Sequence, residues 1–460
     1  MREQGCSTLR PGVGGRILDR LIGLEKAVPP ALIRQALATT GRVNGRACQL
    51  THEITLWVVL AMGLLTDLPI RQVFKHARRL RPGEKTPARS SLCEARKRLG
   101  VEPVQELHRL VVRPLATPQT PGAFYRGFRL MGIDGVVMDV PDSEANAVFG
   151  RSSGGRGEGP FPQARKVSLV ELGTHVETAI AIGTWHDSER ELAQRLFDQI
   201  PSDALLLEDR GFFCYDDWES LYLRVKLLTR VNNGLLLKPI QRLSDGSYLA
   251  KIYRSSHDRE KDRHAIIVRV IEYTLDDPQR KGHGERHRLI TNLTDAEQFP
   301  AMELIELYHE RWEEELVFDE QKTHQDPRRA EKPAQLRSET PEGVKQELYA
   351  LSLAHFVVRS LMFTAAETAQ LDPDRLSFTG CFQVLQCRLP ECPSPTSPSF
   401  TPWFEAMLAE MRQELLPPRR NRVNPRVIKR KMSKWNKKRA SHRRPTPLRK
   451  SFQQSVVIKT

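Results

Sequence analysis

The sequence predicts an α/β protein in which an all-α N-terminal domain precedes a central α/β domain and a disordered basic tail ends the chain. Three patterns indicate this: apolar residues at helical spacing up to about residue 116, short β-rich runs from Phe128 onward, and a C-terminal basic run without an acidic residue. The predicted boundaries are 1–120 for the helical domain, 121–231 and 291–389 for two parts of the central domain, 232–290 for a β-rich insertion, 390–418 for a linker and helix, and 419–460 for the tail.

The composition is that of a soluble globular protein. The 460 residues, 39% of them hydrophobic and 28% charged, are enough for two or three domains. The longest apolar run, Ile54–Leu65, is too short to span a bilayer and favours a buried helix. No apolar leader opens the chain, and its seven cysteines include no CxxC pair, so we expect a cytoplasmic protein with reduced thiols.

The net charge of +15 lies in one segment. Between Arg419 and Lys450 there are 15 Lys and Arg and no Asp or Glu, so the remaining 56 basic and 56 acidic residues cancel. Such a segment is too polar to bury a core, and we expect it to be disordered until it meets a polyanion. DNA is the favoured partner, because Lys and Arg on phosphates release condensed counterions. A solubility tail and a nuclear localisation signal have the same pattern.

Four helical segments are predicted between residues 27 and 116, separated by Gly, Pro or Thr-Pro breaks. The fourth begins near Thr86-Pro87, followed by Ser90 and Ser91, and carries the basic run Arg96, Lys97 and Arg98. Several short helices that end in a basic one suit a DNA-binding module of the helix-turn-helix type. A plain helical domain has the same pattern, so both interpretations stay open.

From Phe128 the chain has the order three strands, helix, strand, helix, strand. The strand-like runs are FRLMGIDGVVMDV, ARKVSLVEL, HVETAIAIG, ALLLED and LRVKLLTRV. This order is the one expected of a ribonuclease-H-like α/β domain. Residues of about 232 to 290 have further β character, and the strand-like run HRLITNL leads into a helix.

That helix, YHERWEEELVFDEQK, carries a charged stripe. At roughly 100° per residue, Tyr308, Arg311, Glu315 and Lys322 share one stripe roughly 60° wide, flanked by apolar residues. The residues predicted on the opposite, solvated face are Glu310, Glu313, Glu314, Glu320 and Gln321. Charged groups on the face toward the protein body indicate either a functional site or a structural ion pair.

Two further carboxylates follow apolar strand runs. Asp134 lies in GIDGVV, and Asp209 ends ALLLED immediately before Arg210. An Asp at a strand end is often a turn former, but strand ends are also where α/β sheets build active sites. Asp134, Asp209 and Glu315 could converge to hold two divalent ions, since carboxylate oxygens are the ligands that Mg²⁺ prefers.

Local alternatives remain for several positions. Asp139 and Asp142 could replace Asp134, although both lie near a Pro turn. His309 and His324 suggest a metal site only if a third ligand is present, and ordinary surface histidines are favoured. Arg210 is expected to contact DNA or to form a local salt bridge.

The spacing Tyr, two residues, Arg, three residues, Glu, six residues, Lys resembles the hallmark of DDE transposases of the insertion-sequence-four family. Tyr308, Arg311, Glu315 and Lys322 match every spacing, while IDGVVMDVPD and LEDRGFF resemble the segments that carry the two catalytic Asp residues of that family. The resemblance extends over most of the chain, from the helical region to the basic tail. No catalytic position departs from the family pattern.

The resemblance implies roles for these residues. Asp134, Asp209 and Glu315 would be catalytic ligands of Mg²⁺ or Mn²⁺, with two ions expected, and Tyr308, Arg311 and Lys322 would hold DNA phosphates. It also implies cut-and-paste transposition in a bacterial cytoplasm: a freed 3′-hydroxyl forms a hairpin at the element's end, and the end is then joined to target DNA. The expected partners are the terminal inverted repeats, target DNA and a second copy in a synaptic dimer. The alternatives are a catalytically silent DNA-binding regulator and a nuclease of the same fold.

Overall fold

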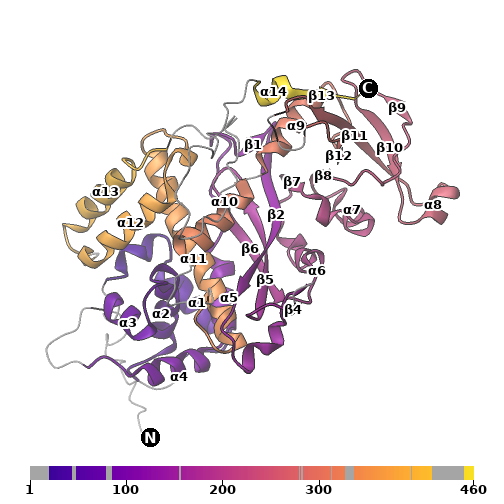
Figure 1. The fold of residues 1–460 in the computed structure, drawn as a ribbon. Helices are drawn as coiled ribbons and strands as arrows, with labels where there is room; N and C mark the ends of the chain where they lie inside the picture. The colour runs from indigo at the N-terminus through magenta and orange to yellow at the C-terminus, as the bar shows by residue number, and fades with distance from the viewer. Residues whose placement is uncertain are drawn as a thin grey trace, which may run out of the picture.

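The computed structural model describes most of the chain. The described residues are 20–43, 48–78, 85–154, 157–278, 280, 283–311, 313–326, 336–394, 396–416 and 450–459. A single large sheet runs through the centre of the molecule, and a helical layer packs on one side of it (Figure 1).

The central strands and helices follow the predicted order. They are β2 (Phe128–Asp139), β5 (Gln163–Glu171), β6 (Val176–Thr184), α6 (Glu189–Gln194), β7 (Ala204–Glu208), α7 (Tyr215–Leu221) and β8 (Lys226–Arg230). Their order in the sheet is β6-β5-β2-β7-β8, with β2, β7 and β8 parallel and β5 antiparallel to both of its neighbours. The buried run ALLLE of β7 is apolar on both faces because helices or strands cover both sides. This arrangement confirms the α/β class and fits the ribonuclease-H-like order.

The β-rich insertion continues the same sheet. It consists of β9 (Gln241–Arg242), β10 (Tyr248–Ile252), α8 (Ser256–Glu260), β11 (Ile266–Leu275) and β12 (His287–Thr291). Its strand β12 pairs antiparallel with β8, and β11, β10 and β9 follow in order toward the edge. The insertion is therefore joined to β8, and through it to β7 and β2, by a continuous ladder of hydrogen bonds. The shorter strands elsewhere are β1 (Phe124–Tyr125), β3 (Ser153–Gly154) and β4 (Gly157–Glu158).

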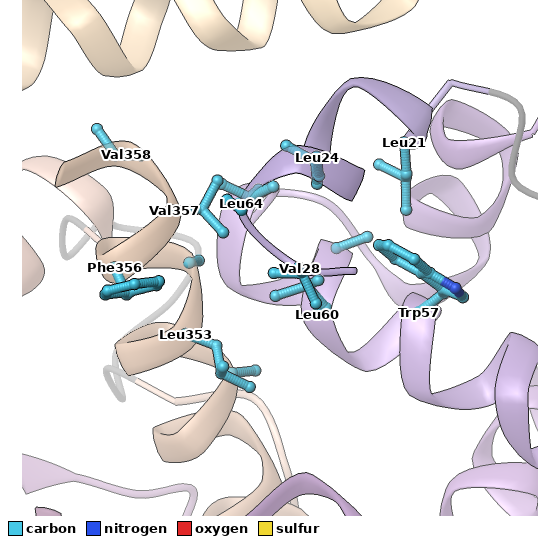
Figure 2. Packing of buried hydrophobic residues seen from close by; sticks show 14 of the residues in the cluster. Leu21, Leu24, Val28, Trp57, Leu60, Leu64, Leu353, Phe356, Val357 and Val358 are labelled. Atoms are coloured by element: carbon cyan, nitrogen blue, oxygen red, sulfur yellow. The ribbon is translucent and has the colours of Figure 1, made fainter. Parts of the chain in front are cut away.

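The N-terminal helices share one core with the helices near the end of the chain. They are η2 (Ile22–Lys26), α1 (Pro30–Thr39), α2 (His52–Leu64), α3 (Ile70–Ala77), α4 (Arg89–Leu99) and α5 (Glu102–Val111). Helix α2 lies along α11 (Pro341–Glu367), and Figure 2 shows Leu64 of α2 against Val357 of α11. The two helices approach closely at Gly63, where a Cβ would meet the carbonyl oxygen of Ala350 at 2.2 Å. The predicted buried helix at Ile54–Leu65 is thereby confirmed.

Helix α11 is long and apolar enough to cross a membrane by its length and composition alone. However, 83% of its apolar window is buried inside the protein, so it is the central helix of this core. It packs against α12 (Phe378–Arg388) and α13 (Phe400–Met411), with the short η7 (Pro373–Arg375) and η8 (Leu389–Glu391) between them.

The basic helix of the N-terminal domain is α4. It begins at Arg89, after Ala88, and no side chain caps its first turn. Of its basic run, Lys97 and Arg98 are exposed. Arg96 instead points to α11, where it donates to Gln346 Oε1 at 3.0 Å and to the carbonyl of Gly343 at 3.1 Å. Two of the three basic side chains are thus exposed, with Lys97 at 2.8 Å from Glu94, and the third is structural.

The end of the chain corrects the predicted disordered tail. Residues 419–449 of the basic segment lie outside the described residues, but Lys450–Lys459 are ordered. They form the short helix α14 (Phe452–Ser455) and the strand β13 (Val456–Ile458), which pairs antiparallel with β11. This segment, Ser451–Lys459, has only one charged residue, and its apolar residues Phe452 and Val456 are buried, which is why it folds onto the sheet.

Candidate active site

Two carboxylates lie side by side where β7 ends beside β2. The parallel register pairs Ile133 with Glu208, which places Asp134 and Asp209 at the next level of the sheet. Each carboxylate accepts a hydrogen bond from the amide that follows it, Asp134 from Gly135 at 2.8 Å and Asp209 from Arg210 at 2.7 Å. A Cβ at Gly135 would meet the side chain of Glu189 at 2.7 Å, so a larger residue there would displace this carboxylate. The sheet therefore brings together two of the predicted site residues.

Two more predicted residues reach this pair from one helix, α9 (Ala301–Glu310), and the residue after it. The Tyr308 hydroxyl donates to Asp209 Oδ1 at 3.2 Å. Arg311 lies between the carboxylates, with Nη1 at 3.8 Å from Asp134 Oδ2 and Nη2 at 3.9 Å from Asp209 Oδ2. We call Asp134, Asp209, Tyr308 and Arg311 the catalytic cluster, after the roles predicted for them from the sequence. It places a shared counter-charge between two acids.

The two acids of the catalytic cluster have different pKa values. Burial, together with the nearby charges of Glu189 and Asp209, raises the pKa of Asp134 to about 6, despite the amide of Gly135 and the charge of Arg311. Burial also opposes ionisation of Asp209. There, however, the Arg210 amide, the charge of Arg311 and the Tyr308 hydroxyl outweigh burial and hold the pKa below its ordinary value. Asp209 is therefore the first of the two to ionise as pH rises.

The predicted regular helix through Glu315 and Lys322 is instead divided. Helix α9 ends at Glu310, α10 (Glu313–Asp319) follows, and the chain then widens into the π-helix η6 (Glu320–Gln325). A uniform 100° step therefore does not hold from Tyr308 to Lys322. The side chain of Glu315 is exposed, and no group of three or more His, Cys, Asp or Glu that could hold a metal forms among the described residues. The role of Glu315 as third metal ligand stays a prediction.

Lys322 lies in η6, and its Nζ donates to the carbonyl of Val137 at 2.7 Å. Val137 follows Asp134 by three residues on β2, so Lys322 contacts the strand that carries this acid. The ammonium group has three donors in all.

The prediction of a solvated face at Glu320 and Gln321 is wrong. Both side chains are buried, because the wide turn of η6 directs them toward the sheet and α11. Glu320 pairs with Arg359 and accepts from His355 at 2.9 Å, and Gln321 donates to Glu177 at 3.0 Å. These partners stand far away in sequence, and they compensate the cost of burying the carboxylates.

Comparisons with known proteins agree with this geometry. Residues 19–109 match the family model described as insertion element 4 transposase N-terminal, and residues 127–357 match the transposase DDE domain. The chain is 32% identical over 426 residues to transposase InsG for insertion sequence element IS4 of Escherichia coli K12, which covers 90% of this chain and 93% of the relative.

The chain belongs to the IS4 family of DDE transposases. A second relative, the putative transposase InsZ of the same bacterium, is 26% identical over 191 residues, or 41% of this chain and 63% of the relative. The family implies an enzyme that cleaves DNA and transfers strands, binds DNA and depends on a divalent metal ion.

The catalytic cluster of the transposase fits a divalent cation. Its acids present carboxylate oxygens, the hard ligands that Mg²⁺ prefers. The guanidinium of Arg311, within 4 Å of both acids, places a positive charge between them. A cation held by Asp134 and Asp209 would offset the same two negative charges.

The alternative carboxylate ligands considered from the sequence have polar partners outside the catalytic cluster. Asp139 accepts from Gln163 at 2.8 Å, and Asp142 pairs with Arg151. His309 and His324 are both exposed, as predicted, and His324 lies 3.6 Å from Asp319. Arg210 is exposed beside Asp209, and its contact with DNA stays a prediction.

Arg230 is a residue of the site that the sequence analysis missed. The register of β7 and β8 pairs Glu208 with Thr229, so Arg230 stands level with Asp209 at the same sheet edge. Its charge lowers the pKa of both Asp209 and Tyr308, and its Nη2 lies 3.3 Å from His287 Nδ1 on β12. The sequence could have indicated Arg230, because it is a basic residue at the end of β8, the strand that follows Asp209 in the chain.

Proposed function

We propose that this transposase moves its insertion sequence by a cut-and-paste route, in which a freed 3′-hydroxyl attacks the opposite strand to form a hairpin before the end is joined to target DNA. The observation that carries the proposal is the catalytic cluster: two adjacent acids share Arg311, and Tyr308 donates to one of them. A structural ion pair needs only one acid and one base. Two acids on adjacent strands, one of them with a pKa of about 6, suit a site that exchanges a cation.

Asp134, Asp209 and Glu315 are the proposed ligands of Mg²⁺ or Mn²⁺, with two ions held in the working enzyme. Bound divalent ions would polarise the scissile phosphate and stabilise charge on the entering and leaving oxygens. Because the pKa of Asp134 is about 6 and that of Asp209 is lowered, both acids are ionised at neutral pH and can act as ligands.

Tyr308, Arg311, Lys322 and Arg210 are the proposed contacts to the phosphates of the transposon end. Burial raises the pKa of Tyr308 far above neutral pH, so its hydroxyl stays protonated and acts as a donor. The planar guanidinium of Arg311 suits a bidentate phosphate contact, while Lys322 supplies a point charge. Arg210 is exposed at the entrance to the acids.

The proposed partners are the element's terminal inverted repeats, target DNA and a second copy of the chain in a synaptic dimer. The exposed Lys97 and Arg98 of α4 provide a basic surface for the repeats, and the basic segment after Arg419 adds phosphate contacts. The proposed location is the bacterial cytoplasm, on the nucleoid when DNA is bound.

Strand transfer on a labelled transposon end tests the proposal. Purified protein is incubated with the end, a target plasmid and Mg²⁺, and the products are separated on denaturing gels. Hairpin ends and joined products are expected. Cleavage without joining would indicate a nuclease, and binding without cleavage would indicate a regulator.

Two variants sharpen this assay. Asp209→Ala should abolish cleavage and joining while end binding stays within a few fold. Asp142→Ala is the matched control, because it removes a carboxylate that pairs with Arg151 outside the catalytic cluster. Glu315→Gln should behave like Asp209→Ala, and wild-type cleavage by that variant would remove Glu315 from the proposed ligands.

A further inference from the structure

We infer that the β insertion and the C-terminal segment hold helix α9 at its two ends, which makes Asp245 and Phe452 positioning residues for Tyr308 and Arg311. The inference rests on the proposed roles of these two residues in the active site. It assigns a task to the insertion and to Lys450–Lys459, neither of which touches the acids.

The first end of α9 is held by a residue of the insertion. Pro300 precedes the helix and its side chain cannot cap the first turn. Asp245, in the turn between β9 and β10, accepts from the amide of Ala301 at 2.8 Å instead. A carboxylate at this position satisfies an orphan amide and complements the positive end of the helix dipole.

Asp245 is itself held rigidly. The side chain of Arg269, which is fully buried on β11, pairs with it, and Ser247 donates to it through both its amide and its hydroxyl. Arg269 also donates to the carbonyl of Phe299 at 2.6 Å, just before α9 begins. One buried guanidinium therefore links β11, the turn and the entrance to the helix.

The second end of α9 is held by the C-terminal segment. The ring of Phe452 stacks on the imidazole of His309, with 3.9 Å between centroids and 13° between planes. Figure 1 shows α14 and β13, in yellow, beside α9 and β11. Phe452 is only 9% exposed and shares an apolar cluster with Tyr308 and Tyr273.

The C-terminal segment is anchored to β11 by directed contacts. Its strand β13 pairs Val456 with Leu275 and Ile458 with Tyr273. The amide of Asp276 donates to the carbonyl of Ser455 at 2.6 Å, and Arg280 Nη2 donates to the carbonyl of Lys450 at 3.0 Å. Contacts on both sides of Phe452 in the chain, at Lys450 and from Ser455 onward, thus fix this segment to the sheet.

The contacts at the two ends of α9 fix its position relative to the sheet that carries the two acids. Asp134 and Asp209 belong to β2 and β7, and the same sheet continues through β8 and β12 to β11. Apolar packing alone is not directional, and an error of about 1 Å in a catalytic group can lower a rate by about a hundredfold. The cap by Asp245 and the ring of Phe452 stacked on His309 fix the orientation of α9, which apolar packing alone would leave less defined.

The test uses full-length protein with the variants Phe452→Ala and Asp245→Asn. The matched control is Val457→Ala, which changes an exposed side chain of β13, 42% accessible, in the same segment. The single-turnover rate of end cleavage at saturating DNA should fall about tenfold or more for Phe452→Ala, with end binding within about twofold. Phe452→Tyr should restore the rate, because the ring is kept.

A double-mutant cycle with Tyr308→Phe distinguishes positioning from general damage. If Phe452 acts through Tyr308, Phe452→Ala should cost less in the Tyr308→Phe background than in the wild type. The inference would be overturned if the two substitutions lowered the rate independently, so that the double variant showed the product of the two single effects. An unchanged cleavage rate for Phe452→Ala would also overturn it. If Phe452→Ala does not fold, Phe452→Leu keeps the apolar contact without the ring and replaces it in the cycle.

Hydrogen exchange separates this inference from the proposed function. Amides of Ala301–Glu310 should exchange faster in Phe452→Ala and Asp245→Asn, and at the wild-type rate in Val457→Ala. Unchanged exchange in the first two variants would overturn the inference whatever the activity. If exchange rises but Tyr308→Phe and Arg311→Lys cleave normally, the proposed roles of those two residues fail and the holding of α9 stands.

Discussion

The substitution of Asp134 by Asn should stabilise the metal-free protein while it abolishes cleavage. Burial raises the pKa of this acid from 3.8 to about 6, which means that the folded protein resists its ionisation. A difference of about two pKa units corresponds to about 3 kcal/mol at 1.36 kcal/mol per unit. The side chain is 24% exposed, so this figure needs little reduction for solvent screening.

The sign of the effect follows from proton linkage. Between about pH 4 and pH 6 the folded state binds the proton of Asp134 more tightly than the unfolded state, so the free energy of unfolding falls as pH rises through this window. Above pH 6 the wild type bears the full free-energy cost of burying the ionised Asp134 carboxylate, and Asp134→Asn avoids this cost. The gain of the variant should therefore be about 3 kcal/mol at pH 8 and should vanish near pH 4.

Urea unfolding at pH 8 and pH 4, in EDTA, measures this difference. The matched variant is Asp209→Asn, because the pKa of Asp209 is lowered and its carboxylate stabilises the fold above its ordinary pKa. That variant should be less stable than the wild type at pH 8, opposite in sign to Asp134→Asn. Mg²⁺ should stabilise the wild type and leave both variants unchanged. Equal gains for Asp134→Asn at the two pH values would refute the burial argument.

Three further predictions concern other parts of the molecule. Replacing the Lys and Arg residues of 419–449 by Gln while keeping 450–459 should lower the salt dependence of DNA binding, measured as the slope of log affinity against log salt, and an unchanged slope would show that the segment does not contact phosphates. Truncation near Pro418 is a poorer test, because it also removes the segment that packs on β11. Lys166→Met should destabilise the protein by about 3–5 kcal/mol in urea unfolding, because it leaves the carboxylate of Glu177 buried without its cation. The charge of Lys166 helps to lower the pKa of Glu177 to about 2. The control Lys97→Met, which removes an exposed ion pair, should change the stability little. Gly63→Ala should cost about 1–3 kcal/mol by overpacking α2 against α11, and a thermal midpoint equal to that of the wild type would contradict the close approach.

The sequence was sufficient for the central strands and for the two aspartates. Apolar β runs in the order found here leave few topologies, and the parallel pairing of β2 with β7 then places Asp134 beside Asp209. The spacing of Tyr308 and Arg311 also placed both on the face toward the acids, because three residues make nearly one helical turn.

Where the chain departs from regular geometry, spacing was a poor guide. The helix divides after Glu310 and widens at Glu320, so the predicted stripe does not continue to Lys322. Arg359, His355 and Lys166 draw Glu320 and Gln321 inward, and nothing within the helix itself indicates those partners. The structural role of Arg96 was hidden from the sequence for the same reason, because its partners stand on α11.

By itself, the sequence determined the strand order, the acids at the strand ends and the family, since these depend on local patterns of apolar and charged residues. Only the tertiary structure decided that the insertion continues the catalytic sheet, that the chain's last residues return to β11, and that Asp245 and Phe452 hold α9. Each of those contacts joins residues far apart in the chain. Periodicity reports which face of an element is buried, but the partner that covers it is chosen by the packing of the whole fold.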